Sequence, residues 1–162
     1  MKELEILRIL EQDSRIPPEK IATMVDLSKE EVEEKIKELE DKGVIIKYKA
    51  IVDWEKASID EIVYAFIDVK VAPQRDIGFD RVARRIYQFP EVHALYLLSG
   101  AYDLEVIVEG KGMKEVAYFV AEKLATLEGV QSTATHFVLK RYKVDGVVVE
   151  PAEKDRRLTL TL

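Results

Sequence analysis

The sequence of 162 residues contains no cysteine and only two histidines. Without cysteine there can be no disulfide, thiolate nucleophile or cysteine-based zinc site. The histidines, His93 and His136, lack the i, i+4 helical spacing of a metal-binding pair, so we expect structural or surface roles for both. The sequence also shows no nucleophile–base pair, phosphate-binding glycine loop or carboxylate cluster with metal-ligand spacing. It therefore predicts a protein that is not an enzyme and holds no cofactor or metal.

Long apolar runs are also missing, because no stretch approaches the roughly 20 residues that a membrane-spanning helix needs. Residues 1–5 are too polar for a signal peptide, so we expect a soluble, cytoplasmic protein with no membrane partner. Positive charge is in deficit, with 25 Lys and Arg against 31 Asp and Glu and a net charge of −6. This balance argues against a protein that coats nucleic acid through a broad positive field, but it leaves room for a local basic patch.

What the sequence does have is helical periodicity in residues 1–47. A stripe of Leu4, Leu7 and Leu10, widened by Ile6 and Ile9, predicts the apolar face of a first helix. Start and end signals mark two further helices. Pro17 and Pro18 suit the first turn of a second helix, where a missing N–H costs nothing. The apolar faces of the second and third helices are expected to include Ile21, Met24, Val25, Val32, Ile36 and Leu39.

The third helix has the clearest boundaries. Ser28, with Glu31 three residues later, predicts a capping box, and Gly43 predicts the C-terminal cap. Residues 44–52 are rich in β-branched side chains and predict an extended segment. Three short helices and a β hairpin make a winged helix-turn-helix, whose third helix enters the DNA major groove while the wing contacts the backbone. The alternative is a small three-helix bundle used for packing or dimerisation.

Beyond residue 52 the pattern becomes mixed. Residues 53–61 form a polar cluster that predicts a linker. The next expected elements are strands 62–71, 92–98, 104–108 and 130–144 and helices 79–89 and 114–127. Their βαββαβ order is that of a ferredoxin-like fold. We therefore predict an α+β chain, with a winged helix-turn-helix at 1–52, a ferredoxin-like domain at 62–146 and a tail at 147–162.

Two helices on one face of a four-stranded sheet leave the other face open. Residues 94–98 and 106–108 are almost continuously apolar, as in strands buried on both faces. We therefore expect a homodimer joined through these sheets. The tail alternates Leu158, Leu160 and Leu162 with Thr159 and Thr161, which fits an added edge strand, a tie between subunits or a frayed terminus.

Motifs in both halves of the chain resemble one family of proteins. In the first half they are Leu7-Arg8-Ile9-Leu10, Ile21-Ala22, Val25-Asp26-Leu27-Ser28, Val32, Ile36, Leu39 and Lys42-Gly43-Val44-Ile45. In the second half, residues 99–103 are similar to a Gly-x-Tyr-Asp loop. The family is that of the Lrp/AsnC, or feast/famine, regulators, and the resemblance covers about residues 2–144. It implies a ligand-responsive, sequence-specific transcriptional regulator that binds double-stranded DNA as a dimer or larger homo-oligomer.

The loop at 99–103 suits a small amino acid. Gly100 permits a tight turn or a close approach of the backbone to a ligand. Exposed N–H groups there can receive a carboxylate, while Asp103 can pair with an ammonium; a plain hairpin connection is the alternative. The resemblance implies that an amino acid or related metabolite binds here, with Tyr102 packed against the partner subunit. The expected effector site is Ser99, Gly100, Ala101, Tyr102, Asp103, Thr133 and Thr135.

The expected recognition helix is acidic. It carries Glu30, Glu31, Glu33, Glu34, Glu38, Glu40 and Asp41 against Lys29, Lys35, Lys37 and Lys42. Carboxylates repel phosphates, so we interpret most of these glutamates as a solvated face. We expect DNA binding that is weak per monomer and helped by oligomerisation, or narrowly sequence-dependent. The expected DNA contacts are Ser28, Lys29, Lys35, Lys37, Lys47 and Lys49.

Two other functions stay open from the sequence. A sensor or interaction subunit of the same fold, without strong DNA binding, agrees with the acidic third helix. The sirohaem decarboxylase subunits resemble the family in both domains, and such an enzyme would need basic residues and a proton donor around a tetrapyrrole. The scarcity of histidine ranks this enzyme last.

Overall fold

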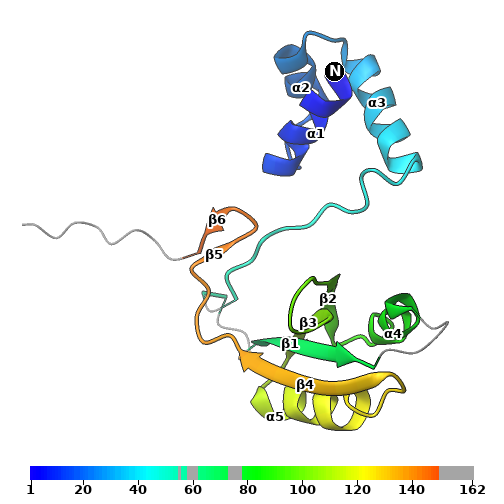
Figure 1. Ribbon diagram of the computed structural model, residues 1–162. Helices are drawn as coiled ribbons and strands as arrows, with labels where there is room; N and C mark the ends of the chain where they lie inside the picture. The colour runs from blue at the N-terminus through cyan, green and yellow to red at the C-terminus, as the bar shows by residue number, and fades with distance from the viewer. Residues whose placement is uncertain (55, 58–61, 73–77, 150–162) are drawn as a thin grey trace, which may run out of the picture. The chain divides into compact units, whose positions relative to one another are not determined.

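The computed structural model of the chain describes residues 1–54, 56–57, 62–72 and 78–149 (Figure 1). The chain divides into two compact units, Met1–Ile51 and Val52–Leu162, called here the N-terminal and C-terminal units. Within the described ranges, no helix has both the length and the apolar character needed to cross a bilayer.

Three helices form the N-terminal unit, which confirms the predicted set. They are α1 (Lys2–Gln12), α2 (Pro18–Val25) and α3 (Lys29–Asp41). Pro18 lies in the first turn of α2, as expected. The shared core consists of Ile6, Ile21, Ala22, Val25 and Val32, with Ile9, Leu10, Ile16, Leu27 and Ile36 packed against it.

Two residues of the predicted apolar faces are exposed. Leu4 is 55% exposed and Met24 is 61% exposed, whereas Ile6 is fully buried. The face of α1 that packs in the core carries Ile6, Ile9 and Leu10, which are spaced i, i+3, i+4. That phase turns Leu4 to the far side of α1. The core positions assigned to Leu4 and Met24 are therefore wrong.

Both ends of α3 follow the sequence signals. The Ser28 Oγ accepts a hydrogen bond from the Glu31 N–H at 3.2 Å, and a Glu31 carboxylate oxygen accepts one from the Ser28 N–H at 2.8 Å. At the other end Gly43 has a φ of +68°, and the following N–H groups of Val44 and Ile45 both donate to the Leu39 carbonyl. These contacts confirm the capping box and the C-terminal glycine.

The expected wing hairpin is absent from the structure. Residues 44–54 are all described, and none of them belongs to a strand. A strand needs a hydrogen-bonded neighbour, and this segment finds none within the N-terminal unit. Its Ile46 is 91% exposed, while the Tyr48 hydroxyl donates to Glu40 on α3 at 2.9 Å. The wing is an extended segment beside α3 rather than a hairpin.

The C-terminal unit has the predicted βαββαβ order and so confirms the ferredoxin-like α+β fold. Its elements are β1 (Val63–Val71), α4 (Phe79–Ile86), β2 (Val92–Leu97), β3 (Leu104–Gly110), α5 (Met113–Tyr118), η1 (Phe119–Leu124) and β4 (Val130–Phe137). The four strands are antiparallel in the order β2-β3-β1-β4, and the helices pack against one face of the sheet, where their buried residues share one core with those of β1 and β3.

Period-2 alternation divides β1 between the two faces of the sheet. Ala65, Ile67, Val69 and Val71 are buried in the core with residues from α4, α5 and η1. The intervening Tyr64, Phe66 and Asp68 lie on the opposite, open face. The alternation of buried and less buried side chains along β1 thus separates the core face of the sheet from its open face.

The last predicted helix changes its winding midway. After α5, η1 is a π-helical turn in which the Ala125 N–H donates to the Val120 carbonyl, five residues earlier. Phe119 and Leu124 are consequently both buried although they are five residues apart. Such turns are rare, and periodicity in the sequence gives no sign of this one.

The last predicted strand, 130–144, is too long. β4 ends at Phe137, and a separate hairpin follows from β5 (Lys143–Val144) and β6 (Val147–Val148). Asp145 and Gly146 both have positive φ, 44° and 83°, as a two-residue type I′ turn requires. Part of the tail therefore forms a strand, while Leu158 to Leu162 lie outside the described residues.

Candidate functional site

The outer face of α3 is the first candidate surface. Val32 and Leu39 are buried, so helical geometry directs Glu30, Glu34, Lys37 and Asp41 away from the core. All four side chains are exposed. This ridge, called here the α3 ridge, presents three carboxylates and one ammonium.

Lys29 forms ion pairs within the N-terminal unit. Its Nζ lies 2.7 Å from a Glu19 carboxylate oxygen on α2 and 3.6 Å from one of Glu33. The Glu19 contact raises the pKa of Lys29 and lowers the pKa of Glu19. Lys29 must therefore leave these partners before it can contact a phosphate. Ser28 keeps its hydroxyl proton for such a contact, because its oxygen serves the cap as an acceptor.

Three other lysines of the expected DNA surface are less engaged. Within the described part of the chain, Lys35, Lys37 and Lys47 have no carboxylate oxygen within 4 Å. Lys35 and Lys37 lie on α3, whereas Lys47 and Lys49 lie on the extended segment that follows it. That segment and α1 together line a groove of about 630 Å³.

The effector loop, residues 99–103, joins β2 to β3. Its Asp103 is turned inward, with 17% of the side chain exposed. One carboxylate oxygen accepts from the Val71 N–H at 2.9 Å and the other from the Lys70 Nζ at 3.2 Å, while the Asp103 N–H donates to the Val69 carbonyl at 3.0 Å. The Val71 N–H and the Lys70 ammonium hold the pKa of Asp103 below its usual value.

These contacts give Asp103 a structural role beside the effector contact expected of it. An effector ammonium has to compete with them, because Asp103 is charge-balanced by Lys70 and each of its oxygens already accepts one hydrogen bond. Asp103 fastens the start of β3 to the end of β1 and thereby fixes the position of the loop. Local sequence patterns do not show this anchoring role, because Lys70 and Val71 lie more than 30 residues away.

The other loop residues are open to solvent. Ser99, Gly100 and Ala101 are exposed and Tyr102 is half-buried. The φ of Gly100 is not in the left-handed region, and a Cβ added there would meet no described atom within 4 Å. Of the two uses expected for Gly100, this open space favours the close approach of a ligand to the backbone.

The two threonines lie on β4 in different relation to this loop. Thr133 pairs with Val69 and Thr135 with Ile67, so both share the helix-covered face of the sheet. Val69 connects Thr133 to the loop, because its carbonyl accepts the Asp103 N–H. Thr135 lies one side-chain position further from the loop.

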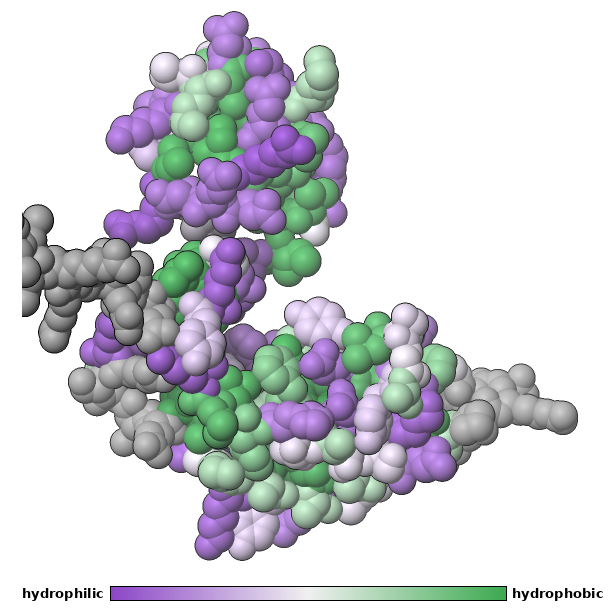
Figure 2. Space-filling model, turned by 60° about the vertical axis from the view of Figure 1, so that its left-hand side comes forward, coloured by the Kyte–Doolittle hydropathy of each residue, from purple (hydrophilic) through white to green (hydrophobic). Residues whose placement is uncertain are grey.

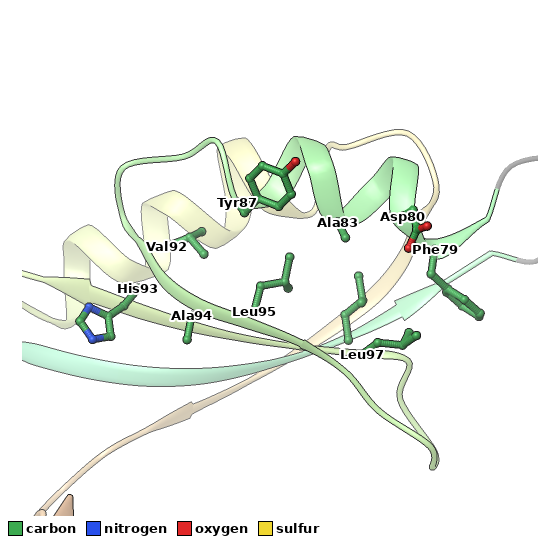
Figure 3. A pocket seen from close by; sticks show the side chains of 10 residues that line it. Phe79, Asp80, Ala83, Tyr87, Val92, His93, Ala94, Leu95 and Leu97 are labelled. Carbon is green, nitrogen blue, oxygen red and sulfur yellow. The ribbon is translucent and has the colours of Figure 1, made fainter. Parts of the chain in front are cut away.

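A groove between α4 and β2 was not expected from the sequence. It has a volume of about 440 Å³ and is called here the α4–β2 groove (Figure 3). Side chains of Phe79 and Ala83 on α4 and of Leu95 and Leu97 on β2 line it. Strand β2 was predicted to be buried on both faces, yet Leu97 is 60% exposed. The exposed side chain of Leu97 forms part of the wall of the groove.

Both histidines lie beside a carboxylate of the C-terminal unit. His136 Nε2 is 3.1 Å from Asp68, and His93 Nδ1 is 3.6 Å from Glu109. Both side chains are more than half exposed, which agrees with the surface role expected for them. In the ranges that the structure covers, no three His, Asp or Glu residues are grouped so as to hold a metal ion.

Apolar side chains also reach the surface of each unit (Figure 2). In the N-terminal unit they include Val44 and Ile46 of the extended segment, and in the C-terminal unit Phe66 and Tyr96 of the open sheet face. Exposed apolar residues gathered in this way are typical of surfaces that bind another molecule.

Comparisons with known proteins agree for both units. A model for winged helix-turn-helix DNA-binding domains matches residues 2–46, and a model for the Lrp/AsnC ligand binding domain matches residues 64–148. The uncharacterised HTH-type transcriptional regulator YugG of Bacillus subtilis is 51% identical over 160 residues, 99% of this chain and 96% of that protein. The HTH-type transcriptional regulator FL11 of Pyrococcus furiosus is 30% identical over 139 residues, 86% of this chain and 88% of that protein.

A solved structure is similar in three dimensions as well. It is the complex of the transcriptional regulator NMB0573 from Neisseria meningitidis with L-Met. The superposition has a TM-score of 0.70 at 27% identity and covers 88% of this chain and 91% of that one.

Proposed function

Because the chain belongs to the Lrp/AsnC family of transcriptional regulators, we propose that it controls transcription in response to an amino acid or a related small metabolite. The observation that carries this proposal is the presence of both family units in one chain, a DNA-binding unit at 2–46 and a ligand-binding unit at 64–148. In this function the chain is not an enzyme, and it acts in the cytoplasm, where its DNA is.

The DNA contact is assigned to α3 and the segment after it. The α3 ridge enters the major groove, and Lys35, Lys37, Lys47 and Lys49 contact phosphates on either side. Glu30 and Glu34 oppose this approach and restrict stable binding to sites where lysine–phosphate contacts hold α3 in place. Affinity for random DNA is therefore low, and selectivity arises partly from repulsion.

The effector contact is assigned to the exposed backbone of the loop. The N–H groups near Gly100 and Ala101 receive the effector carboxylate, and Thr133 lies at the base of the same loop. The complex of NMB0573 with L-Met supports an amino acid as the effector class. Asp103 positions the loop, so the effector ammonium pairs with another group.

A second copy completes the proposal. The open sheet face carries Phe66, Tyr96 and Ile107 with charged neighbours, and covering it with the same face of another chain forms a homodimer. An effector that bridges groups of two copies favours the assembly that presents both, through its differential affinity. Effector binding and DNA affinity are thereby linked.

A mobility-shift titration with the DNA upstream of the protein's own coding region tests this function. Runs at low and moderate salt, with and without each of the twenty amino acids, should show a saturable shift that at least one amino acid alters. Random DNA of equal length is the control. A shift that is equal for both DNAs, or that no amino acid changes, contradicts the proposal.

A second candidate is a sensor subunit of the same fold without strong DNA binding. The acidic α3 ridge and the pairing of Lys29 with Glu19 favour it. Amino-acid binding measured by calorimetry, together with no DNA shift at low salt, would establish this alternative.

A further inference from the structure

The edge of the sheet at β2 lacks the usual protection. In the described structure β2 has only β3 beside it. Its sequence, Val-His-Ala-Leu-Tyr-Leu, contains no lysine, carboxylate or proline, and a single register shift between Val92 and Ala94 interrupts it. Free edges pair readily with other strands and are normally blocked by charge, by proline or by a covering segment. We therefore expect another segment to cover an apolar edge such as that of β2.

The backbone at this edge is ready for another strand. The Leu98 N–H donates to the Asp103 carbonyl across the hairpin, so Leu98 faces β3. Because N–H and C=O groups alternate in direction along a strand, those of Leu97 and Leu95 point to the outer edge. The side chains of these two residues line the α4–β2 groove (Figure 3). An added strand can thus form backbone hydrogen bonds with the edge of β2 and at the same time place side chains in the groove.

The walls of the groove favour a strand over a small molecule. Leu97 is 60%, Tyr87 57% and Phe79 42% exposed. Small-molecule sites enclose about 70–90% of the surface of their ligand. Walls as exposed as these do not enclose a small molecule to that extent. Strand addition instead combines main-chain hydrogen bonds with pockets for alternate side chains.

The chain contains a segment with the matching pattern beyond the described residues. Leu158, Leu160 and Leu162 alternate with Thr159 and Thr161, so an extended conformation would place three leucines on one side. Arg156 and Arg157 precede this alternation, as a charged flank to an apolar run.

We propose that residues 158–162 of this chain add to the free edge of β2 as an antiparallel strand, with their leucines in the α4–β2 groove. The groove has an acidic end, because Asp80 lies near Leu97 and away from His93 (Figure 3). An antiparallel strand enters at that end and brings the arginine pair next to Asp80. This binding goes beyond the regulatory function proposed above and does not depend on it.

Hydrogen exchange of the full-length chain tests the docking. In wild type the Leu95 and Leu97 amides are expected to exchange about tenfold more slowly than in Leu160→Asp, because the added strand protects them. Thr161→Asp is the matched control, since it introduces the same charge one residue away on the opposite side of the strand. Circular dichroism of both variants checks that each keeps the fold. Equal exchange in all three proteins, or equal effects of the two variants, overturns the proposal.

A peptide provides the complementary test. A synthetic peptide of residues 156–162 should restore slow exchange at Leu95 and Leu97 in the Leu160→Asp protein, and the same peptide with Leu160→Asp should not. Asp80→Asn should weaken this peptide about two- to fivefold at low salt, as expected for an exposed ion pair. Failure of the peptide to protect the edge overturns the proposal. Protection of Leu95 and Leu97 in Leu160→Asp that rises with protein concentration also overturns the proposal, because the sheet of a second copy then covers the β2 edge.

Discussion

Helix α3 and the effector loop are both candidate binding elements, but they are held in place by different kinds of contact. The ends of α3 are fixed by residues within a few positions of one another, such as Ser28 with Glu31 and Val44 with Leu39. The loop is fixed by Asp103 reaching back to Lys70 and Val71, more than 30 residues earlier. A recognition surface made by local contacts persists when distant parts of the chain change, whereas one made by distant contacts reports on the packing of its whole unit.

Core truncations should give the largest effects and test whether the two units are independent. Ile6 and Ile67 are fully buried, one in each unit. Ile6→Ala and Ile67→Ala should each lower the free energy of unfolding of their own unit by about 2–5 kcal/mol. Hydrogen exchange resolved by residue measures this in both units at once. If Ile6→Ala accelerated hydrogen exchange equally in β1 and in α2, the two units would not be independent.

Loss of the Asp103 carboxylate should destabilise the C-terminal unit alone. Asp103→Ala leaves the Val71 N–H without its acceptor and Lys70 without its counter-ion, so β1 and β3 should separate more readily at that end. The urea midpoint of this unit should fall, while exchange in α1 to α3 stays unchanged. Gly100→Ala is the control, because the added methyl group has open space. An unchanged midpoint in Asp103→Ala would show that the loop does not depend on distant contacts.

The same carboxylate predicts an acid dependence. The folded pKa of Asp103 lies below its usual value, so its contribution to stability is present above the unfolded pKa of about 3.9 and is lost as pH falls through the folded pKa. The stability difference between wild type and Asp103→Asn should therefore be constant near neutral pH and shrink in acid. Urea titrations from neutral pH into the acid range measure it. A difference that grows in acid would contradict the assignment.

Removal of the cap should have a smaller and strictly local effect. Ser28→Ala leaves the Glu31 N–H without its acceptor and should cost about 1 kcal/mol of stability in the N-terminal unit. Ser28→Thr keeps the hydroxyl and should recover most of the loss. Thermal unfolding followed by circular dichroism gives the change, and a shift in the C-terminal unit would argue against local control of α3.

The smallest effect expected is on the salt dependence of DNA binding. Lys37→Ala should reduce the slope of log affinity against log salt by about one, because one phosphate contact is lost. Lys29→Ala should change the slope less, since Glu19 already pairs with that lysine. Mobility shifts at several salt concentrations compare the two variants. Equal slopes for both would mean that the Lys29–Glu19 pair opens on DNA.

The sequence predicted what local patterns control. The order of helices and strands, the capping box and the cap at Gly43 all follow from spacing within one element. Three predictions about the fold were wrong because apolar periodicity alone does not show the feature that decides them. The expected wing had no neighbour to pair with, Leu4 is turned away by the phase of α1, and β4 ends early because a turn at Asp145 and Gly146 starts another hairpin.

The candidate site was less accessible to sequence reasoning than the fold. The loop and the lysines could be named from motifs, but the engagement of Asp103 and of Lys29 depends on partners far away in sequence or on another helix. The α4–β2 groove was missed because apolar runs look alike whether a strand is covered or exposed. Only the position of β2 at the sheet edge separates the two cases.

The π-helical turn of η1 has a consequence for how the length of the chain can change in evolution. Phe119 and Leu124 both reach the core at a separation of five residues because this turn holds one residue more than an α-helical turn. Deletion of Ala121 would bring them to the i, i+4 spacing of a regular helix and keep both on one face. A one-residue gap is therefore tolerated at this turn, whereas elsewhere in a packed helix it would rotate every later side chain out of register.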